Sequence, residues 1–228
     1  MQETFDFSSY ARQVRKVSKM LMRYGGNAVE LSGTVHLLTT AAERDLARFG
    51  SSPEASHVAC GPGCGACCVL NVSVLFPEAV AITRFLQRRC SKEEMDALRI
   101  KLQELHRKIC WLDDEERLFL REPCAFLDNF GCCTIHAVRP LLCRSITSTD
   151  PHACQEAIAM VALQGAPSVE MDLFHKALFD TVYSEFGWVL ECLGFDHRPM
   201  RLSSIVLKLL DQPEMVALFV SGEKVPIH

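Results

Sequence analysis

Cysteine is the residue with which this sequence could do the most chemistry. The chain has 12 cysteines among 228 residues, and most fall in two windows, 60–68 and 124–154. The first six residues are acidic and polar and lack the apolar run that an export signal needs. We therefore expect a cytoplasmic chain, in which thiols stay reduced. Clustered thiols in that setting are typical of a metal site holding zinc or an iron–sulfur cluster.

The first window reads Cys-Gly-Pro-Gly-Cys-Gly-Ala-Cys-Cys over residues 60–68. If a helical turn begins near Cys64, then Cys67 and Cys68 follow at three and four residues and share its face. The intervening proline and glycine keep Cys60 outside that turn, and the loop can fold it back to the same point. The glycines also allow the backbone to approach a metal closely.

The second window, residues 123–154, is rich in Pro, Gly, Asp and Asn and has no sustained periodicity. This composition predicts mainly shaped loop. Two arginines, Arg139 and Arg144, lie beside its proline and cysteine residues. A zinc ion or a [4Fe–4S] cluster held by four thiolates carries net negative charge. We therefore predict that these two arginines offset that charge as cofactor-binding residues.

Several motifs of the two windows occur in an order that resembles a known family. They are the cysteines ending in Cys67-Cys68, then Glu78-Ala79, Pro123-Cys124-Ala-Phe-Leu, Gly131–Ile135, and Arg139–Arg144. Over roughly residues 58–156 the chain resembles the YkgJ-type proteins, also called the CxxCxxCC family of zinc- or iron-chelating domains. The resemblance implies metal chelation. It places Cys133 at the family position, leaves Cys132 as an extra cysteine, and puts His136 where the family usually has tyrosine.

With this alignment we predict eight metal ligands: Cys60, Cys64, Cys67, Cys68, Cys124, Cys133, Cys143 and Cys154. Adjacent cysteines rarely bind one ion, so Cys67 and Cys68 serve different metals or one of them packs. Eight thiols suit one [4Fe–4S] cluster with spare thiols, one cluster plus one zinc, or two zincs. The irregular spacing favours iron–sulfur slightly over zinc.

Other potential ligands receive plainer interpretations. His57, His136 and His152 flank the windows, and we expect them to be surface residues or hydrogen-bond donors to the ligands. We expect Cys90, Cys110 and Cys192 to pack in the core, because buried free cysteine behaves as a small hydrophobic residue. The acidic run at 113–116 is expected to be a solvated loop or the start of a helix.

Outside the windows, apolar residues recur at helical spacing. The expected helices cover about 6–24, 27–49, 77–88, 91–110, 152–164, 168–191, 202–210 and 213–220. Only 69–76 looks strand-like. The predicted fold is mainly α, an irregular helical domain with a central cysteine-rich metal-binding knot. We expect an N-terminal helical segment at 1–57, the cysteine-cluster core at 58–156, and C-terminal helices at 157–228 that pack on the core.

Three kinds of function fit this pattern. The first is a metal-binding protein in redox, sensing or metal handling. The second is an enzyme that uses its cluster in methyl transfer or with S-adenosylmethionine, since the motif occurs in some flagellin lysine methylases. The third is a structural zinc module that binds a partner. The spacing of Cys60, Cys64 and Cys67 matches that of radical enzymes, but those need a large α/β barrel that a helical chain does not offer.

Charge and hydropathy narrow the partners further. The net charge is −4 and hydrophobic residues make up 49% of the chain. Nucleic-acid binders instead carry a basic footprint, and a bilayer-spanning helix needs about 18 or more consecutive apolar residues. We therefore predict a metal ion or cluster as the partner, with no nucleic acid and no membrane, and leave a protein partner open.

Overall fold

A computed structural model describes residues 5–50, 58–160 and 168–226, and its described part is mainly helical, as predicted. The helices are α1 (Phe7–Met22), α2 (Ala28–Phe49), α3 (Phe76–Arg89), α4 (Lys92–Ile109), α5 (Asp114–Leu120), α6 (Leu141–Ser145), α7 (Pro151–Ala159), α8 (Leu173–Cys192), α9 (Leu202–Asp211) and α10 (Met215–Val220). Two 3₁₀ turns, η1 (Ala66–Val69) and η2 (His136–Val138), lie in the cysteine windows. The short strands β1 (Ser73–Val74) and β2 (Met200–Arg201) pair antiparallel.

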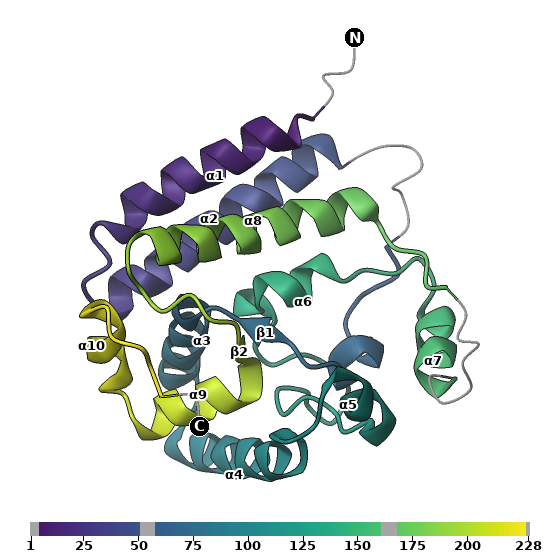
Figure 1. Cartoon of the computed structure of the whole chain (residues 1–228). Helices are drawn as coiled ribbons and strands as arrows, with labels where there is room; N and C mark the ends of the chain where they lie inside the picture. Colours follow the sequence, from purple (N-terminus) through teal and green to yellow (C-terminus); the bar gives the residue numbers. More distant parts are fainter. Residues whose placement is uncertain (1–4, 51–57, 161–167, 227–228) are drawn as a thin grey trace.

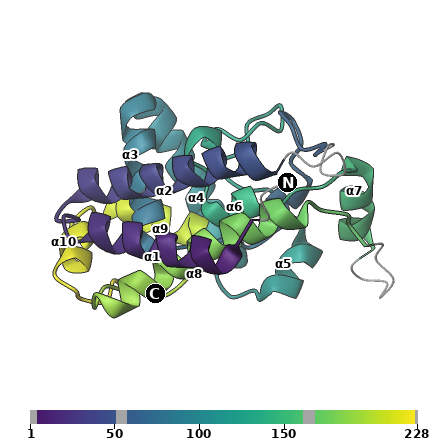
Figure 2. The same ribbon diagram turned by 90° about the horizontal axis from the view of Figure 1, so that it is seen from above.

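Three long helices, α1, α2 and α8, pack side by side along one side of the molecule (Figures 1 and 2). Beneath them α2 packs on α3, α6 packs on α8, and α9 packs on both α3 and α4. The core between these helices is apolar and aromatic, and Phe76, Phe179, Phe186 and Phe219 are fully buried in it. The cysteine-rich segments lie centrally, with α5 and α7 beside them at the edge (Figure 1). No helix in the described ranges is long and apolar enough to cross a bilayer.

Local sequence signals explain where α4 and α5 begin. A capping box starts α4: Glu94 N donates to Ser91 Oγ at 3.2 Å, and Ser91 N donates to Glu94 Oε2 at 2.7 Å. At α5, Glu116 N donates to Asp113 Oδ1 at 2.8 Å and Asp113 N donates to Glu116 Oε2. The acidic run at 113–116 is therefore a helix start, one of the two predicted outcomes.

Some boundaries differ from those predicted. Helix α3 begins at Phe76, so the strand expected over 69–76 shrinks to two residues. Helix α8 begins at Leu173 and not near 168, because the Asp172 side chain caps it there by accepting from His175 N at 2.9 Å. The second window was expected to be mainly loop, yet it contains η2, α6 and the start of α7. Residues 161–164 of the helix expected over 152–164 lie outside the described residues.

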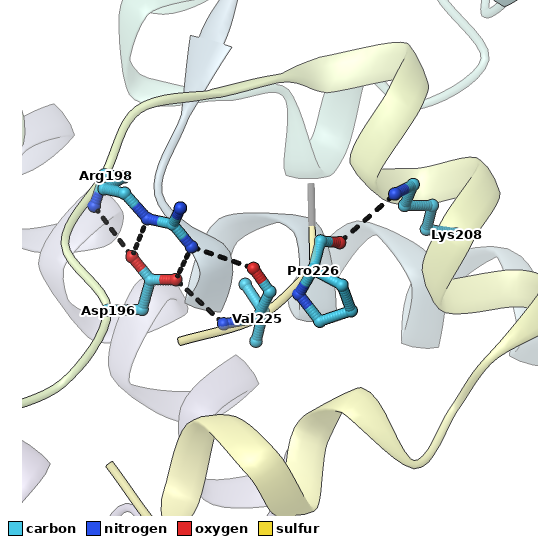
Figure 3. A network of polar contacts seen from close by, with 5 residues as sticks. All are labelled: Asp196, Arg198, Lys208, Val225 and Pro226. Atoms are coloured by element: carbon cyan, nitrogen blue, oxygen red, sulfur yellow. Dashed lines mark hydrogen bonds and ion pairs between the residues drawn. The ribbon is translucent and has the colours of Figure 1, made fainter. Parts of the chain in front are cut away.

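A buried carboxylate anchors the C-terminal segment (Figure 3). Asp196 accepts from Arg198 Nε at 2.9 Å, from Arg198 Nη2 at 2.6 Å, and from Val225 N at 3.0 Å. Arg198 Nη2 also donates to Val225 O at 2.8 Å. Burial opposes the charge on Asp196, but these hydrogen bonds keep its pKa below the usual value. The end of the chain is thus tied to the loop that precedes β2.

We expect Asp196→Ala to destabilise the protein by about 2–4 kcal/mol, because it leaves the Val225 N–H without an acceptor and the Arg198 guanidinium without its carboxylate partner. Urea unfolding followed by circular dichroism measures the change. Glu223→Ala is the matched control. The Glu223 side chain accepts from the exposed Ser221 hydroxyl, so its loss should stay within about 0.5 kcal/mol. Equal effects in the two variants would contradict an anchoring role for Asp196.

Candidate metal centre

Backbone hydrogen bonds bring the two cysteine windows together. Cys124 N donates to Cys68 O at 2.8 Å, which joins the end of the first window to the start of the second. At the other end, Ser148 N donates to Cys60 Sγ at 3.3 Å across 88 positions of the chain. Ala59 N donates to Ser148 O at 2.8 Å beside it. The two windows are therefore held to each other at both ends.

Two glycines allow the loops of the two windows to touch. Gly63 and Gly131 have φ values of 85° and 73°, a conformation that side-chain-bearing residues rarely adopt. A Cβ atom on Gly131 would lie 3.1 Å from Gly63 O. Asp128 Oδ1 fixes the second loop by accepting from Phe130 N at 2.9 Å and from Cys132 N at 2.8 Å. Glycine is needed here both for the turn and for the close contact.

The helical turn that was expected to begin near Cys64 begins two residues later. The 3₁₀ turn η1 begins at Ala66, so Cys64 lies outside it. Cys64 N instead closes an earlier turn by donating to Gly61 O at 3.0 Å. Gly65 separates the two turns, and a Cβ there would lie 3.1 Å from Leu127 Cδ1. Cys64 reaches the site from a loop, while Cys67 and Cys68 reach it from η1.

One cavity of about 200 Å³ gathers most of the predicted ligands. Its walls include seven of the eight: Cys60, Cys64, Cys67, Cys68, Cys124, Cys133 and Cys143. The eighth, Cys154, does not line the cavity. It lies close enough to Cys60 for its charge to raise the pKa of that thiol, and its helix α7 packs on η1. Among the described residues, no three Cys, His, Asp or Glu side chains already stand as a metal site. The structure thus brings these thiols to one cavity without selecting a coordination set.

Cys67 lies centrally among these thiols. The negative charge of its thiolate raises the pKa of four neighbouring thiols: Cys60, Cys68, Cys124 and Cys143. The Cys68 thiol hydrogen-bonds to the sulfur of Cys67; this lowers the pKa of Cys67 and raises that of Cys68. Burial raises the pKa of Cys124 to about 11. Within the Cys67–Cys68 pair, Cys67 is therefore the thiol that favours the thiolate form.

The two predicted arginines differ in what they contact. Arg144 is committed to its own loop and to α2: Nε donates to Arg139 O at 2.9 Å, Nη2 donates to Ala137 O at 3.1 Å, and Nη1 pairs with Glu43. Arg139 lines the thiol cavity, and its Nε is buried without a hydrogen-bond partner. Its positive charge favours the thiolates of Cys67 and Cys143. Of the pair, Arg139 is the one with a free donor beside the thiols.

Two further residues at this cavity were missed by sequence reasoning. Arg117 on α5 is only 1% exposed, and while its Nη2 donates to Glu122 O, its Nε and Nη1 are buried without partners. It lines the thiol cavity, and its charge favours the thiolate of Cys124. His175 on α8 also lines the cavity, with Nε2 buried and unpartnered. No spacing rule marks either one, because each comes from a helix outside the cysteine motifs.

Glu78 positions the helix that carries Cys143. Its side chain is 1% exposed; Oε2 accepts from Leu75 N and Oε1 accepts from Leu141 N, both at 2.8 Å. It therefore joins the start of α3 to the start of α6. Burial raises the pKa of Glu78 to about 7.

The remaining cysteines and histidines have mixed outcomes. All twelve cysteines are free thiols. Cys90 packs against the core as predicted, but Cys192 ends α8 in an exposed position, so its predicted burial is wrong. Cys110 is half-buried at the end of α4, and Cys132 is half-buried on the Asp128 loop. His136 is exposed at the rim of the cavity, His152 is exposed, and His57 lies outside the described residues.

Comparison with known proteins points to the same part of the chain. Residues 59–162 match the sequence model of the CxxCxxCC family, described as a "putative zinc- or iron-chelating domain". This part of the chain is therefore similar to the domains of that family. The YkgJ-type resemblance is consistent with the match, and the CxxCxxCC domain supports metal binding by zinc or iron. No curated protein and no solved structure matches the chain significantly.

Proposed function

We propose that the CxxCxxCC domain holds an iron–sulfur cluster, with zinc as the alternative, through the thiols that line its cavity. The observation that carries this proposal is the buried Arg117 guanidinium, which has two nitrogens without acceptors in a cavity lined by seven thiols. Each unsatisfied buried polar group costs about 1–3 kcal/mol. A metal–thiolate centre, which is anionic, supplies the missing acceptors and charge. The residues present therefore fit such a group.

The proposed ligands divide into an inner and an outer group. Cys67, Cys124, Cys133 and Cys143 form the inner group, because their charges act on one another around Cys67. Cys60, Cys64 and Cys154 form the outer group, because the charges of Cys64 and Cys154 raise the pKa of Cys60. Cys68 hydrogen-bonds to Cys67, and the charges of Cys124 and Cys143 also act on it, so it lies with the inner group. An iron–sulfur cluster held here supplies a one-electron couple, which suits redox or sensing.

The protein's own contribution is to hold the centre and tune its charge. Arg117 on α5 and Arg139 in the second window offer buried donors at the cavity wall, and His175 Nε2 offers or accepts one more hydrogen bond. Hydrogen bonds to cluster or thiolate sulfur raise the reduction potential of such centres. We further propose that residues 58–156 form the metal-binding core and that the helices before and after it pack around that core.

Anaerobic purification followed by iron, acid-labile sulfide and zinc analysis tests the proposal. The expected result is a brown protein with iron and sulfide in equal amounts and a reversible reduction potential. A colourless protein with stoichiometric zinc, whose removal unfolds the chain without any redox response, would replace the cluster with a structural zinc site. Purified protein that takes up neither metal would overturn both forms of the proposal.

A further inference from the structure

A second cavity, of about 220 Å³, lies between α2 and α3 beside η2. Four arginines line it: Arg84, Arg88, Arg139 and Arg144. Hydroxyl-bearing side chains from α2, including Ser32 and Thr39, complete the wall. The chain as a whole has a net charge of −4, so four guanidinium groups around one cavity are a local reversal of the protein's charge.

The acidic residues at this cavity pair with only one of its four arginines within the described ranges. Glu43 pairs with Arg144. The carboxylate of Glu78 is taken up by the backbone N–H groups of Leu75 and Leu141. Within the described ranges, no carboxylate pairs with Arg84, Arg88 or Arg139.

The arginines of α3 and the arginine that follows η2 line the same cavity. Arg84 and Arg88 are four residues apart on α3 and therefore share a face of the helix. Arg139 follows η2 and lines both this cavity and the thiol cavity, so its charge lies between the two.

We propose that this cavity binds the phosphoryl group of a small phosphate-bearing molecule. Guanidinium forks match phosphate oxygens in geometry and charge, and neighbouring hydroxyl groups add neutral donors. A phosphate monoester carries about −1.5 to −2 charges at neutral pH, which suits three unpaired arginines better than a single carboxylate does. A cavity of about 220 Å³ between two packed helices admits a small molecule and not a folded partner. The proposal does not depend on which metal the thiols bind.

Isothermal titration calorimetry of the full chain tests the proposal with three probes: inorganic phosphate, glycerol 3-phosphate and acetate, each at the same ionic strength. Both phosphate compounds should bind saturably and acetate should not. Tighter binding of the monoester than of free phosphate identifies an ester as the natural ligand, and the reverse order identifies free phosphate. Absence of saturable binding by both phosphate compounds overturns the proposal.

Variants on α3 localise the site. Arg84→Gln and Arg88→Gln should each weaken phosphate binding by roughly tenfold or more, since one charge-assisted contact is worth about 1.5 kcal/mol or more. Arg89→Gln is the matched control: Arg89 lies on the same helix but stacks over Phe85 and does not line the cavity. Its affinity should stay within about twofold of the parent. Equal weakening in all three variants means general charge attraction and rejects the cavity. Circular dichroism of each variant separates lost binding from lost fold.

Discussion

Cys67→Ser should lower the affinity for metal by more than about 100-fold. Loss of a residue that merely supports a ligand typically costs 10–100-fold, and Cys67 is proposed as a ligand at the middle of the group. The hydrogen bond from the Cys68 thiol also lowers the pKa of Cys67, which favours its thiolate form. Competition with a chromophoric chelator measures the zinc affinity, and reconstitution with iron and sulfide measures cluster uptake.

Cys192→Ser is the control for this experiment. Cys192 is an exposed free thiol at the end of α8 and is absent from the cavity wall, so metal content should not change. The loss of metal affinity in Cys154→Ser should lie between the losses in Cys67→Ser and Cys192→Ser. The charge of Cys154 raises the pKa of Cys60, but Cys154 does not line the cavity. Full metal content in Cys67→Ser would refute the central place given to Cys67, while leaving metal binding itself to be judged from the parent protein.

Glu78→Ala should destabilise the protein by about 2–5 kcal/mol. The substitution leaves the buried N–H groups of Leu75 and Leu141 without acceptors, each at a cost of about 1–3 kcal/mol. It also frees the start of α6 from α3, which displaces Cys143. Urea unfolding of metal-free protein isolates the stability effect, and metal affinity measured below the transition reports the displacement. Wild-type stability in Glu78→Ala would contradict the bridging role.

Glu78 also makes stability depend on pH. Burial raises the pKa of its carboxyl from 4.5 to about 7, so the folded state favours the protonated form. The free energy of unfolding is therefore highest below about pH 4.5, falls as the pH rises from there to about 7, and levels off above that, while the hydrogen bonds to Leu75 N and Leu141 N persist. Glu78→Gln removes the titrating group, and we expect its stability curve to be flatter than the parent's across this interval. An unchanged curve would assign the pH dependence to other groups.

Local signals explain which parts of the fold were predictable. The helices α2 and α4 follow from apolar periodicity, and Ser91 and Glu94 mark the start of α4 within the chain itself. The short helix α6 carries no such signal, because it depends on a tertiary contact between Leu141 N and the distant Glu78 carboxylate. Boundaries set by long-range hydrogen bonds are invisible to a pattern read along the sequence.

The site shows the same division. The thiols could be named from their spacing and from the family resemblance, and the structure places seven of them on one cavity. Arg117 could not be found in this way. It follows an acidic run that is typical of a solvated segment, and only the folded structure shows that it is buried beside Cys124. Counter-charges for a metal centre come from wherever the fold brings a basic side chain.

The contact between Cys60 and Ser148 has a consequence for how the chain reaches its native state. It closes a loop that contains α3, α4 and α5. A metal bound by thiols from both windows would hold that loop closed even when the helices inside it have melted, and so would reduce the conformational entropy of the unfolded chain. During synthesis the first window emerges well before the second. Its thiols must therefore wait for their partners, and the domain can capture its metal only after most of the chain has been made.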